Sequence, residues 1–303
     1  MIVEIAVTGL SALPSFPESM LTPMGPVAAE QKAHLLRVIA LTMIAVLPVL
    51  IGAPLLLWRY RYRQGGAQYR PGWSFNKYLE CAMWGVPVAI ILSLAGTMIT
   101  STRKLDPATP LGPTPLQIQA IGLNWKWLFI YPEQGVASID ALVVPVGRPV
   151  ELSMTSDTVM QSLMVPALFG QNYAMPGMVT KMNFLGGLTG ITTGRNWQFS
   201  GGDFPKQQFS ALVVPVQQFT AWVDAGQRQM IALNADSYAV IARPGTPAEA
   251  LAAVGLPSGS MIAMRQEDPA LFERVVARYN GGTDRMPSGQ SAGMSHANPM
   301  VAQ

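Results

Sequence analysis

Six methionines between residues 150 and 185 are the side chains of this sequence that could bind a soft metal ion. Thioether sulfur is a ligand for Cu(I), and imidazole and thiolate are its usual companions. The chain has one cysteine, Cys81, and two histidines, His34 and His296, all distant in sequence from these methionines. Methionine also fills irregular cores and interfaces, which is the role we expect here. The six are Met154, Met160, Met164, Met175, Met178 and Met182.

Four aromatic rings occupy every second position of the stretch NWKWLFIYPEQG. They belong to Trp125, Trp127, Phe129 and Tyr131. Because side chains alternate between the two faces of a strand, this spacing predicts a strand with one aromatic face. Trp and Tyr suit half-wet boundaries, since their polar tips need partners. We therefore expect this face to meet both a partner protein and the core of the chain.

Two uncharged stretches, at about 38–58 and 81–102, are long enough to cross a bilayer. A membrane-spanning helix needs about 20 apolar residues. The chain is only 12% charged, against about 25% in soluble domains. Pro48, Pro54 and Pro87 interrupt the two stretches, which neighbouring helices can accommodate. The pattern predicts a transmembrane hairpin and makes two buried helices of a soluble core a weak alternative.

The charges around the two spans predict their orientation. The link at 59–80 carries five basic residues and no acidic residue before Glu80. The positive-inside rule places this link in the cytoplasm, and the N-terminal segment and everything after Arg103 outside. The net charge of +3 comes mostly from this link, so it indicates no nucleic-acid partner.

The sequence of the exported part predicts short strands followed by helices. Four prolines in LDPATPLGPTP predict a stiff linker, and short apolar runs with turn signals then predict an antiparallel sandwich or barrel. Gly147 to Pro149 would join two strands, and Pro176-Gly177 would form a tight turn. From about residue 217 helical spacing appears, and DPALFERVVARYNGG predicts an amphipathic helix with Asp268 at its start.

The sequence carries, in this order, the two spans, the linker, WKWLFIYPEQG and SDTVMQSLMVPALFGQNYAMPGM. With these features the chain resembles subunit II of the haem–copper terminal oxidases. WKWLFIYPEQG is most similar to the quinol-oxidising branch of bo-type ubiquinol oxidases. The resemblance implies a two-helix transmembrane hairpin followed by an exported all-β cupredoxin-like sandwich or barrel with short C-terminal helices.

In the cytochrome c branch this sandwich holds a dinuclear copper centre with Cys, His and Met ligands. The resemblance places other residues at the ligand positions of this chain, so no thiolate or imidazole is available there. A dinuclear copper site cannot be assembled from them. The positions that the resemblance assigns are Gln161, Asn196, Gln198, Ser200, Phe204 and Gln207.

The resemblance implies a non-redox structural subunit of a proton-pumping oxidase that oxidises ubiquinol and reduces oxygen to water in the bacterial inner membrane. Subunit I would hold the haems, one copper and the quinol, with subunits III and IV as further partners and no role for cytochrome c. The implied organisation is an exported segment 1–32, a hairpin 33–104, a linker 105–115, a copper-free cupredoxin-like domain 116–225, a helical extension 226–285 and a disordered tail 286–303.

Two candidate roles follow from this family context. With no copper to feed, the aromatic strand would pack against subunit I near the membrane surface rather than carry electrons. Glu80 would lie at the mouth of a proton pathway into subunit I; the alternative is an ordinary interfacial carboxylate balanced by Lys77. A different class of function also stays open, namely a free-standing membrane-anchored binding or assembly protein. The small residues and prolines of the spans favour helices packed on a partner.

Overall fold

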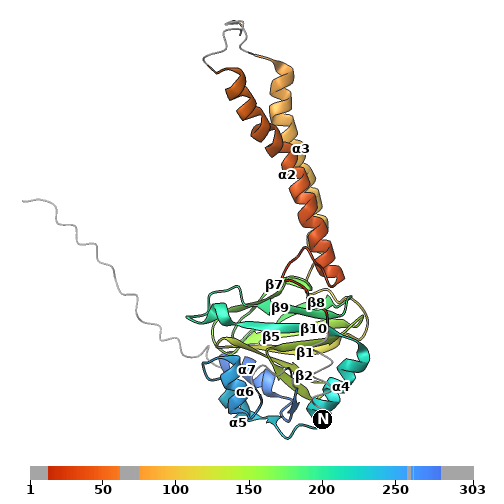
Figure 1. Cartoon of the computed structure of the whole chain (residues 1–303), viewed down its shortest axis with the longest axis vertical. Coiled ribbons are helices and arrows are strands. Elements are labelled where there is room, and N and C mark those ends of the chain that lie inside the picture. Colours follow the sequence, from red (N-terminus) through yellow and green to blue (C-terminus); the bar gives the residue numbers. More distant parts are fainter. Residues whose placement is uncertain (1–12, 62–71, 73–74, 258–260, 262, 281–303) are drawn as a thin grey trace, which may run out of the picture.

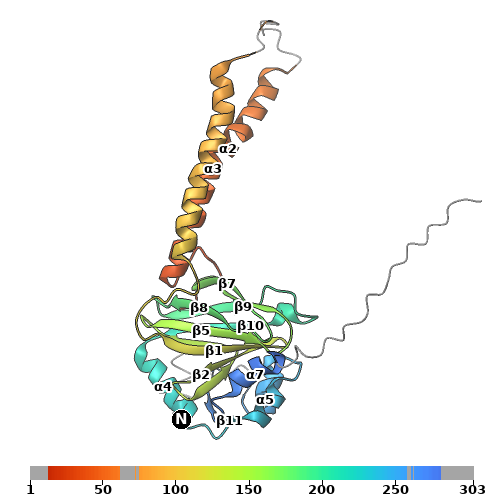
Figure 2. The same cartoon turned by 180° about the vertical axis from the view of Figure 1, so that it is seen from behind.

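The computed structural model describes residues 13–61, 72, 75–257, 261 and 263–280. Two long helices run side by side away from a compact β-rich part, as both Figure 1 and Figure 2 show. Strands β7 and β8 lie nearest to the helices, and the short helices of the C-terminal part lie at the opposite end. The predicted tail at 286–303 lies outside the described residues.

The long helices are α2 (Pro26–Arg59) and α3 (Lys77–Lys104). Both are long and apolar enough to cross a membrane by length and composition. They continue through the three prolines, as expected. Each extends beyond its predicted span, and α2 begins at Pro26, well before the first uncharged residue of the span. The extra turns of α2 contact strands β7 and β8 of the exported part.

Two sheets form the predicted sandwich. The larger sheet has the order β11-β12-β3-β2-β1-β5-β8, and the smaller has the order β4-β10-β9-β6-β7. The strands are β1 (Leu116–Leu123), β2 (Lys126–Tyr131), β3 (Val136–Ile139), β4 (Ala141–Pro145), β5 (Pro149–Ser156), β6 (Gln161–Val165), β7 (Phe169–Ala174), β8 (Thr180–Leu185), β9 (Gly190–Arg195), β10 (Gln208–Val214), β11 (Ala232–Leu233) and β12 (Met264–Gln266).

The sandwich is mixed rather than purely antiparallel. Strand β1 pairs in parallel with β5, and β4 pairs in parallel with β10. The strands before and after Gly147 therefore belong to different sheets instead of forming one hairpin. The predicted turn at Pro176-Gly177 is present, with Gly177 in the left-handed region at φ 74°. An apolar strand shows in its sequence which face is buried but not which strand will be its neighbour.

A C-terminal extension covers the outer face of the larger sheet. Helices α5 (Ala235–Ile241), α6 (Pro247–Ala253) and α7 (Leu271–Asn280) form this cover, whereas α4 (Val216–Gln227) packs its buried side chains into the core between the two sheets. The predicted helix is present but begins at Leu271, and Asp268 lies in the preceding turn, where its Oδ1 atom accepts from the backbone N–H of Ala270 at 3.2 Å. The sequence did not reveal β11 and β12, which extend the larger sheet beyond β3.

Strand β2 therefore has apolar contacts on both faces. Its aromatic side chains belong to the core between the two sheets, whereas Leu128 and Ile130 belong to a second core with α5, α6 and α7. The domain has three layers: the smaller sheet, the larger sheet, and helices α5, α6 and α7. The third layer explains why every residue of β2 is buried.

Candidate functional site

Four of the six positions assigned to copper ligands meet at one end of the sandwich. Gln161 begins β6, and Asn196 and Gln207 flank the loop between β9 and β10, which also carries Ser200. Gln161 and Gln207 are completely buried, and Asn196 and Ser200 are buried as well. Residues from two separate segments thus converge on one interior point.

A continuous chain of hydrogen bonds joins these four side chains. Gln207 Nε2 donates to Gln161 Oε1 at 2.7 Å, and Asn196 Nδ2 donates to Gln207 Oε1 at 2.9 Å. Asn196 Nδ2 also donates to Ser200 Oγ at 2.9 Å. Gln161 Nε2 in turn donates to the carbonyl oxygen of Leu123 at 3.0 Å and to Thr158 Oγ1 at 2.9 Å. We call Gln161, Asn196, Ser200 and Gln207 the amide network.

The amide network does not suit copper. A dinuclear copper centre needs soft thiolate and imidazole ligands with lone pairs directed inward. Here amide N–H groups point at neighbouring amide oxygens, so the side chains satisfy one another. Nowhere in the described parts of the chain does a group of three or more His, Cys, Asp or Glu residues gather to hold a metal ion. The arrangement can hold loop and strands together.

The other two assigned positions lie outside the amide network. Gln198 contributes only its backbone N–H, which donates to Asn196 Oδ1 at 2.9 Å. Phe204 is half-buried, and its ring packs on Phe199 with centroids 5.2 Å apart. The loop surface is therefore aromatic where the copper branch has a histidine ligand.

Close backbone approach at Gly122 makes room for the amide network. A Cβ atom at this position would lie 2.6 Å from Gln161 Oε1, so any larger residue would displace that side chain. Trp125 covers the loop from the other side, donating from Nε1 to the carbonyl oxygen of Ser200 at 3.3 Å. A glycine next to this contact, Gly201, has φ 111°.

The four aromatic residues do not share one exposed face. Trp127, Phe129 and Tyr131 are completely buried in the chain's own core, where Phe129 and Phe209 have ring centroids 5.1 Å apart. The expectation that these three contact a partner is wrong, because no surface of theirs is available. Trp125 leaves the alternation: it lies in the turn before β2 at φ 66° and is only partly buried. It stays a candidate partner contact.

Glu80 lies in the first turn of α3, at the end of the hairpin far from the sandwich. At 1.5 Å per residue it is ~36 Å along the helix from Lys104. Its side chain is exposed, and no described basic group lies within ion-pair distance. Lys77 instead places its Nζ atom 5.2 Å from the centroid of the Tyr78 ring.

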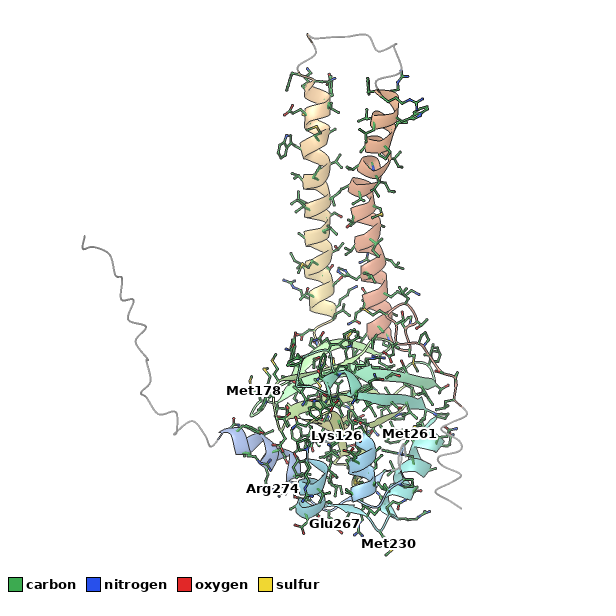
Figure 3. All side chains as sticks on the ribbon, turned by 60° about the vertical axis from the view of Figure 1, so that its left-hand side comes forward. Lys126, Met178, Met230, Met261, Glu267 and Arg274 are labelled. Atoms are coloured by element: carbon green, nitrogen blue, oxygen red, sulfur yellow. The ribbon has the colours of Figure 1, made fainter. Side chains whose placement is uncertain are left out.

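Lys126 is a buried charge that the sequence did not mark as special. Its Nζ atom donates to the carbonyl oxygens of Asn124, Arg243 and Gly245 at 3.2, 2.8 and 3.2 Å. It thereby ties the segment between α5 and α6 to β2, and Figure 3 places it where the C-terminal helices meet the sandwich. Burial lowers the pKa of Lys126, and the nearby carboxylates of Asp140 and Glu249 oppose this shift.

Asp140 lies close to Lys126, where the chain passes from β3 in one sheet to β4 in the other. Its Oδ1 atom accepts from the backbone N–H of Trp127 at 2.6 Å. Its buried Oδ2 atom has no hydrogen-bond partner among the described residues. Burial raises the pKa of Asp140 to about 8, against the hydrogen bond from Trp127 and the charge of Lys126, which lower it.

A buried carboxylate, Asp157, fastens the last helix to the sandwich. Arg278 of α7 donates from Nη1 to both carboxylate oxygens, at 2.8 and 2.7 Å, and the Tyr238 hydroxyl donates to Oδ2 at 2.6 Å. Burial, followed by this hydrogen bond to the carboxylate, raises the pKa of Tyr238. The side chain of Asp157 is only 3% exposed, so its contacts are poorly replaced by water.

Replacing Asp157 with Asn should loosen the C-terminal helices, because the charge that holds Arg278 and Tyr238 is lost. We expect a loss of about 2 kcal/mol in the free energy of unfolding. Hydrogen exchange of α5 and α7 in the detergent-solubilised chain measures this, with Asp236→Asn as an exposed control. Unchanged protection of α7 would show that its apolar face alone holds it.

The methionines lie in different environments. Met154 and Met182 belong to the core between the sheets, whereas Met160 and Met178 are 39% and 54% exposed. Packing therefore accounts for the two core residues.

Comparisons with known proteins identify relatives of this sequence. The chain is 41% identical over 197 residues to the cytochrome bo(3) ubiquinol oxidase subunit 2 of Pseudomonas putida, an alignment that covers 64% of this chain and 63% of that protein. It thus spans slightly less than two thirds of that relative. The ubiquinol oxidase subunit 2 of Acetobacter aceti is 34% identical over 290 residues, covering 92% of this chain and 90% of that protein.

Among solved structures, the periplasmic domain of subunit II of cytochrome oxidase from Bradyrhizobium japonicum is 25% identical, with a TM-score of 0.35 over 36% of this chain and 91% of that one. No family model matches the sequence. The relationship with the Acetobacter aceti protein extends through the helices and the exported domain, since it covers nearly the full length of both chains. The chain therefore belongs to the subunit 2 family of ubiquinol oxidases.

Proposed function

We propose that this chain is the non-redox structural subunit of a proton-translocating respiratory oxidase that oxidises ubiquinol and reduces oxygen to water. The observation that carries the proposal is the amide network. Four buried side chains, at the positions that the family resemblance assigns to copper ligands, hydrogen-bond to one another, and this supports an exported domain that receives no electrons. Electrons would pass from quinol to oxygen entirely within subunit I, which would hold the haems and one copper.

The two long helices support a role within an assembly in the bacterial inner membrane. Apolar side chains are exposed along much of both helices, and those of Leu57, Trp84 and Leu92 are 77%, 68% and 68% exposed. Helix α2 is also fixed to the sandwich near its start, because the Met24 N–H donates to the Ala167 carbonyl oxygen at 2.7 Å. The hairpin would thus hold the exported domain over subunit I, with subunits III and IV as further partners, the domain outside and the link in the cytoplasm.

Purification of the complex through a tag on this chain tests the proposal. Subunit I with its haems should be recovered, with oxygen uptake driven by ubiquinol and none driven by reduced cytochrome c. Recovery of the chain alone, without haem, would reject the proposal and favour a free-standing binding or assembly protein. No observation on the described residues favours that alternative.

We further propose that Glu80 collects protons at the cytoplasmic mouth of a pathway into subunit I. Its exposed carboxylate and its lack of an ion-pair partner in the described structure suit this role better than neutralisation by Lys77. Replacing Glu80 with Ala should slow proton uptake several-fold while haem content stays normal, because proton delivery and not assembly is impaired. Stopped-flow measurement with a pH dye checks this.

The matched control is Lys77→Ala, which removes a neighbouring charge of opposite sign from the same helix end. It should leave proton uptake near the unmodified rate. Unchanged turnover of Glu80→Ala would leave Glu80 as an ordinary interfacial carboxylate.

A further inference from the structure

A small cavity with both polar and apolar walls lies where the two long helices join the sandwich. It has a volume of about 100 Å³ and is lined by residues of α2, of the segment after α3, and of β7 and β8. The residues that matter for its chemistry are Gln31, Lys104, Asp106 and Asn183. None of them takes part in the amide network. We call this cavity the junction cavity.

Two residues that line the junction cavity each have a buried oxygen atom without a hydrogen-bond donor among the described residues. These atoms are Oε1 of Gln31 and Oδ1 of Asn183. Asn183 is 5% exposed, and its orientation is fixed because Nδ2 donates to the Pro107 carbonyl oxygen at 3.0 Å. A buried acceptor without a donor costs about 1–3 kcal/mol. The cavity therefore favours a ligand that brings N–H or O–H groups.

The charges at the junction cavity complement those of a zwitterion. The ammonium group of Lys104 and the carboxylate of Asp106 both line it. No described carboxylate lies within ion-pair distance of Lys104, so its charge is available to an anionic group. Asp106 adds a negative charge beside the two amide oxygens. An ammonium group on the side of the oxygens and a phosphate on the side of Lys104 would satisfy both.

The depth of these residues matches the head-group layer. Gln31 precedes the first uncharged residue of the span, Val38, by about 10 Å of helix, and Lys104 follows the last residue of the second span by ~3 Å. The polar layer on each side of the hydrocarbon is about 5–8 Å thick. Gln31 thus lies just beyond this layer and Lys104 lies within it, the order in which a phospholipid presents its amine and its phosphate.

A second, larger hollow of about 520 Å³ continues toward the spans. It shares Leu105, Asp106 and Pro107 with the junction cavity, and it adds Met98 and Arg103. Another wall residue, His34 of α2, is held by a contact of 3.0 Å between its Nδ1 atom and Ser101 Oγ. Apolar walls below a basic residue suit the glycerol and the first part of the acyl chains.

We infer that the junction cavity binds the head group of an aminophospholipid, with its primary ammonium on Gln31 Oε1 and Asn183 Oδ1 and its phosphate near Lys104. A phosphocholine head group has the same charges but no N–H donor, so it cannot satisfy the two oxygens. Phosphatidylethanolamine should therefore be preferred to phosphatidylcholine, and the bound lipid would join the exported domain to both helices.

The test uses the complex purified through this chain and exchanged into nanodiscs with equal amounts of phosphatidylethanolamine and phosphatidylcholine. Native mass spectrometry measures which lipid stays bound. Gln31→Leu removes one acceptor, so it should lower the ratio of bound phosphatidylethanolamine to bound phosphatidylcholine about tenfold at this site. Gln31→Glu keeps the acceptor and adds negative charge, so the ratio should be kept or raised. Gln217→Leu is the matched control on exposed α4.

Nanodiscs with equal amounts of phosphatidylethanolamine and phosphatidylglycerol test whether the head-group donor is an ammonium or a hydroxyl group. The inference requires that Gln31→Glu shifts binding toward phosphatidylethanolamine. Three results would overturn the inference and leave water as the occupant. In Gln31→Glu, binding would shift toward neither lipid. The unmodified complex would retain phosphatidylcholine as well as phosphatidylethanolamine, or the ratio of these two lipids would be unchanged in Gln31→Leu. If Gln31→Leu fails to assemble, the response of Gln31→Glu still decides.

Discussion

Replacing Gln207 with Leu is expected to lower the free energy of unfolding of the exported domain by about 3 kcal/mol. The change removes the donor to Gln161 Oε1 and the acceptor for Asn196 Nδ2, and both atoms are buried. A buried polar group without a partner costs about 1–3 kcal/mol. Denaturant unfolding of the detergent-solubilised chain, followed by tryptophan fluorescence, measures the loss.

The neighbouring Gln208→Leu is the matched control. Gln208 is exposed, and its Nε2 atom reaches only the Pro205 carbonyl oxygen at 3.3 Å. This variant should unfold within about 0.5 kcal/mol of the unmodified chain. Equal unfolding of the two variants would show that the amide network adds no stability.

Combining Gln161→Leu with Gln207→Leu tests whether the amide network acts as a unit. Each single change removes one partner of the 2.7 Å hydrogen bond and leaves the other partner buried, whereas the double change removes both. The double variant should therefore lose less than the sum of the two single losses. If it acts as a unit, the amide network would hold the loop between β9 and β10 to the start of β6 without a metal ion.

The sequence predicts the membrane hairpin well because its signal is local. Uncharged length, flanking arginines and the placement of prolines need no knowledge of tertiary contacts. The amphipathic α7 was predictable for the same reason, as Leu271, Phe272 and Val275 repeat with helical period and are buried. Where α2 begins was not predictable, because its first turns are stabilised by contacts with β7 and β8 rather than by lipid.

The aromatic strand shows what a period-two pattern can and cannot predict. Period two correctly places Trp127, Phe129 and Tyr131 on one face. It fails at Trp125, because Leu123 pairs with Lys126 across a two-residue turn and the left-handed conformation of Trp125 interrupts the alternation. Alternation also cannot distinguish a face against a partner from a face against another sheet of the same chain.

The candidate site was predictable in its members but not in its bonding. Ligand counting argues against a dinuclear copper centre from the sequence alone, yet only the folded chain shows Gln161 beside Gln207, which lie 46 residues apart. The hydrogen bonds of Lys126 Nζ to three carbonyl oxygens were still less predictable from the sequence, since two of these oxygens belong to Arg243 and Gly245, 117 and 119 residues away. Such groups have no local signature, because their neighbours are set by how the C-terminal extension packs on β2.

Asp140 should make the domain less stable as the pH rises from acid toward neutral. Its pKa is raised to about 8 in the folded chain, from an ordinary value of 3.8. Between these values the folded state keeps a proton that the unfolded state has released. The stabilisation is thus complete below the unfolded pKa and is lost as the pH rises through the folded pKa, with a slope of about 1.4 kcal/mol per pH unit.

Asp140→Asn isolates this contribution. The amide resembles the protonated acid in shape, can accept from the Trp127 N–H at Oδ1, and tolerates the left-handed φ of 51° at this position. Denaturant unfolding at pH 5.5 and 7.5 should show the unmodified chain losing about 3 kcal/mol relative to the variant, since Lys126 and all other titrating groups are common to both.

Equal pH dependence of the two chains would mean that Asp140 is ionised in the folded state and paired with Lys126. The slope therefore distinguishes two arrangements of one buried pair: a neutral acid beside an ammonium held by three carbonyls, or a buried ion pair. Because Asp140 lies where the chain passes from the larger to the smaller sheet, the first arrangement makes that crossing less stable as the pH rises, whereas the second makes it less stable only in acid.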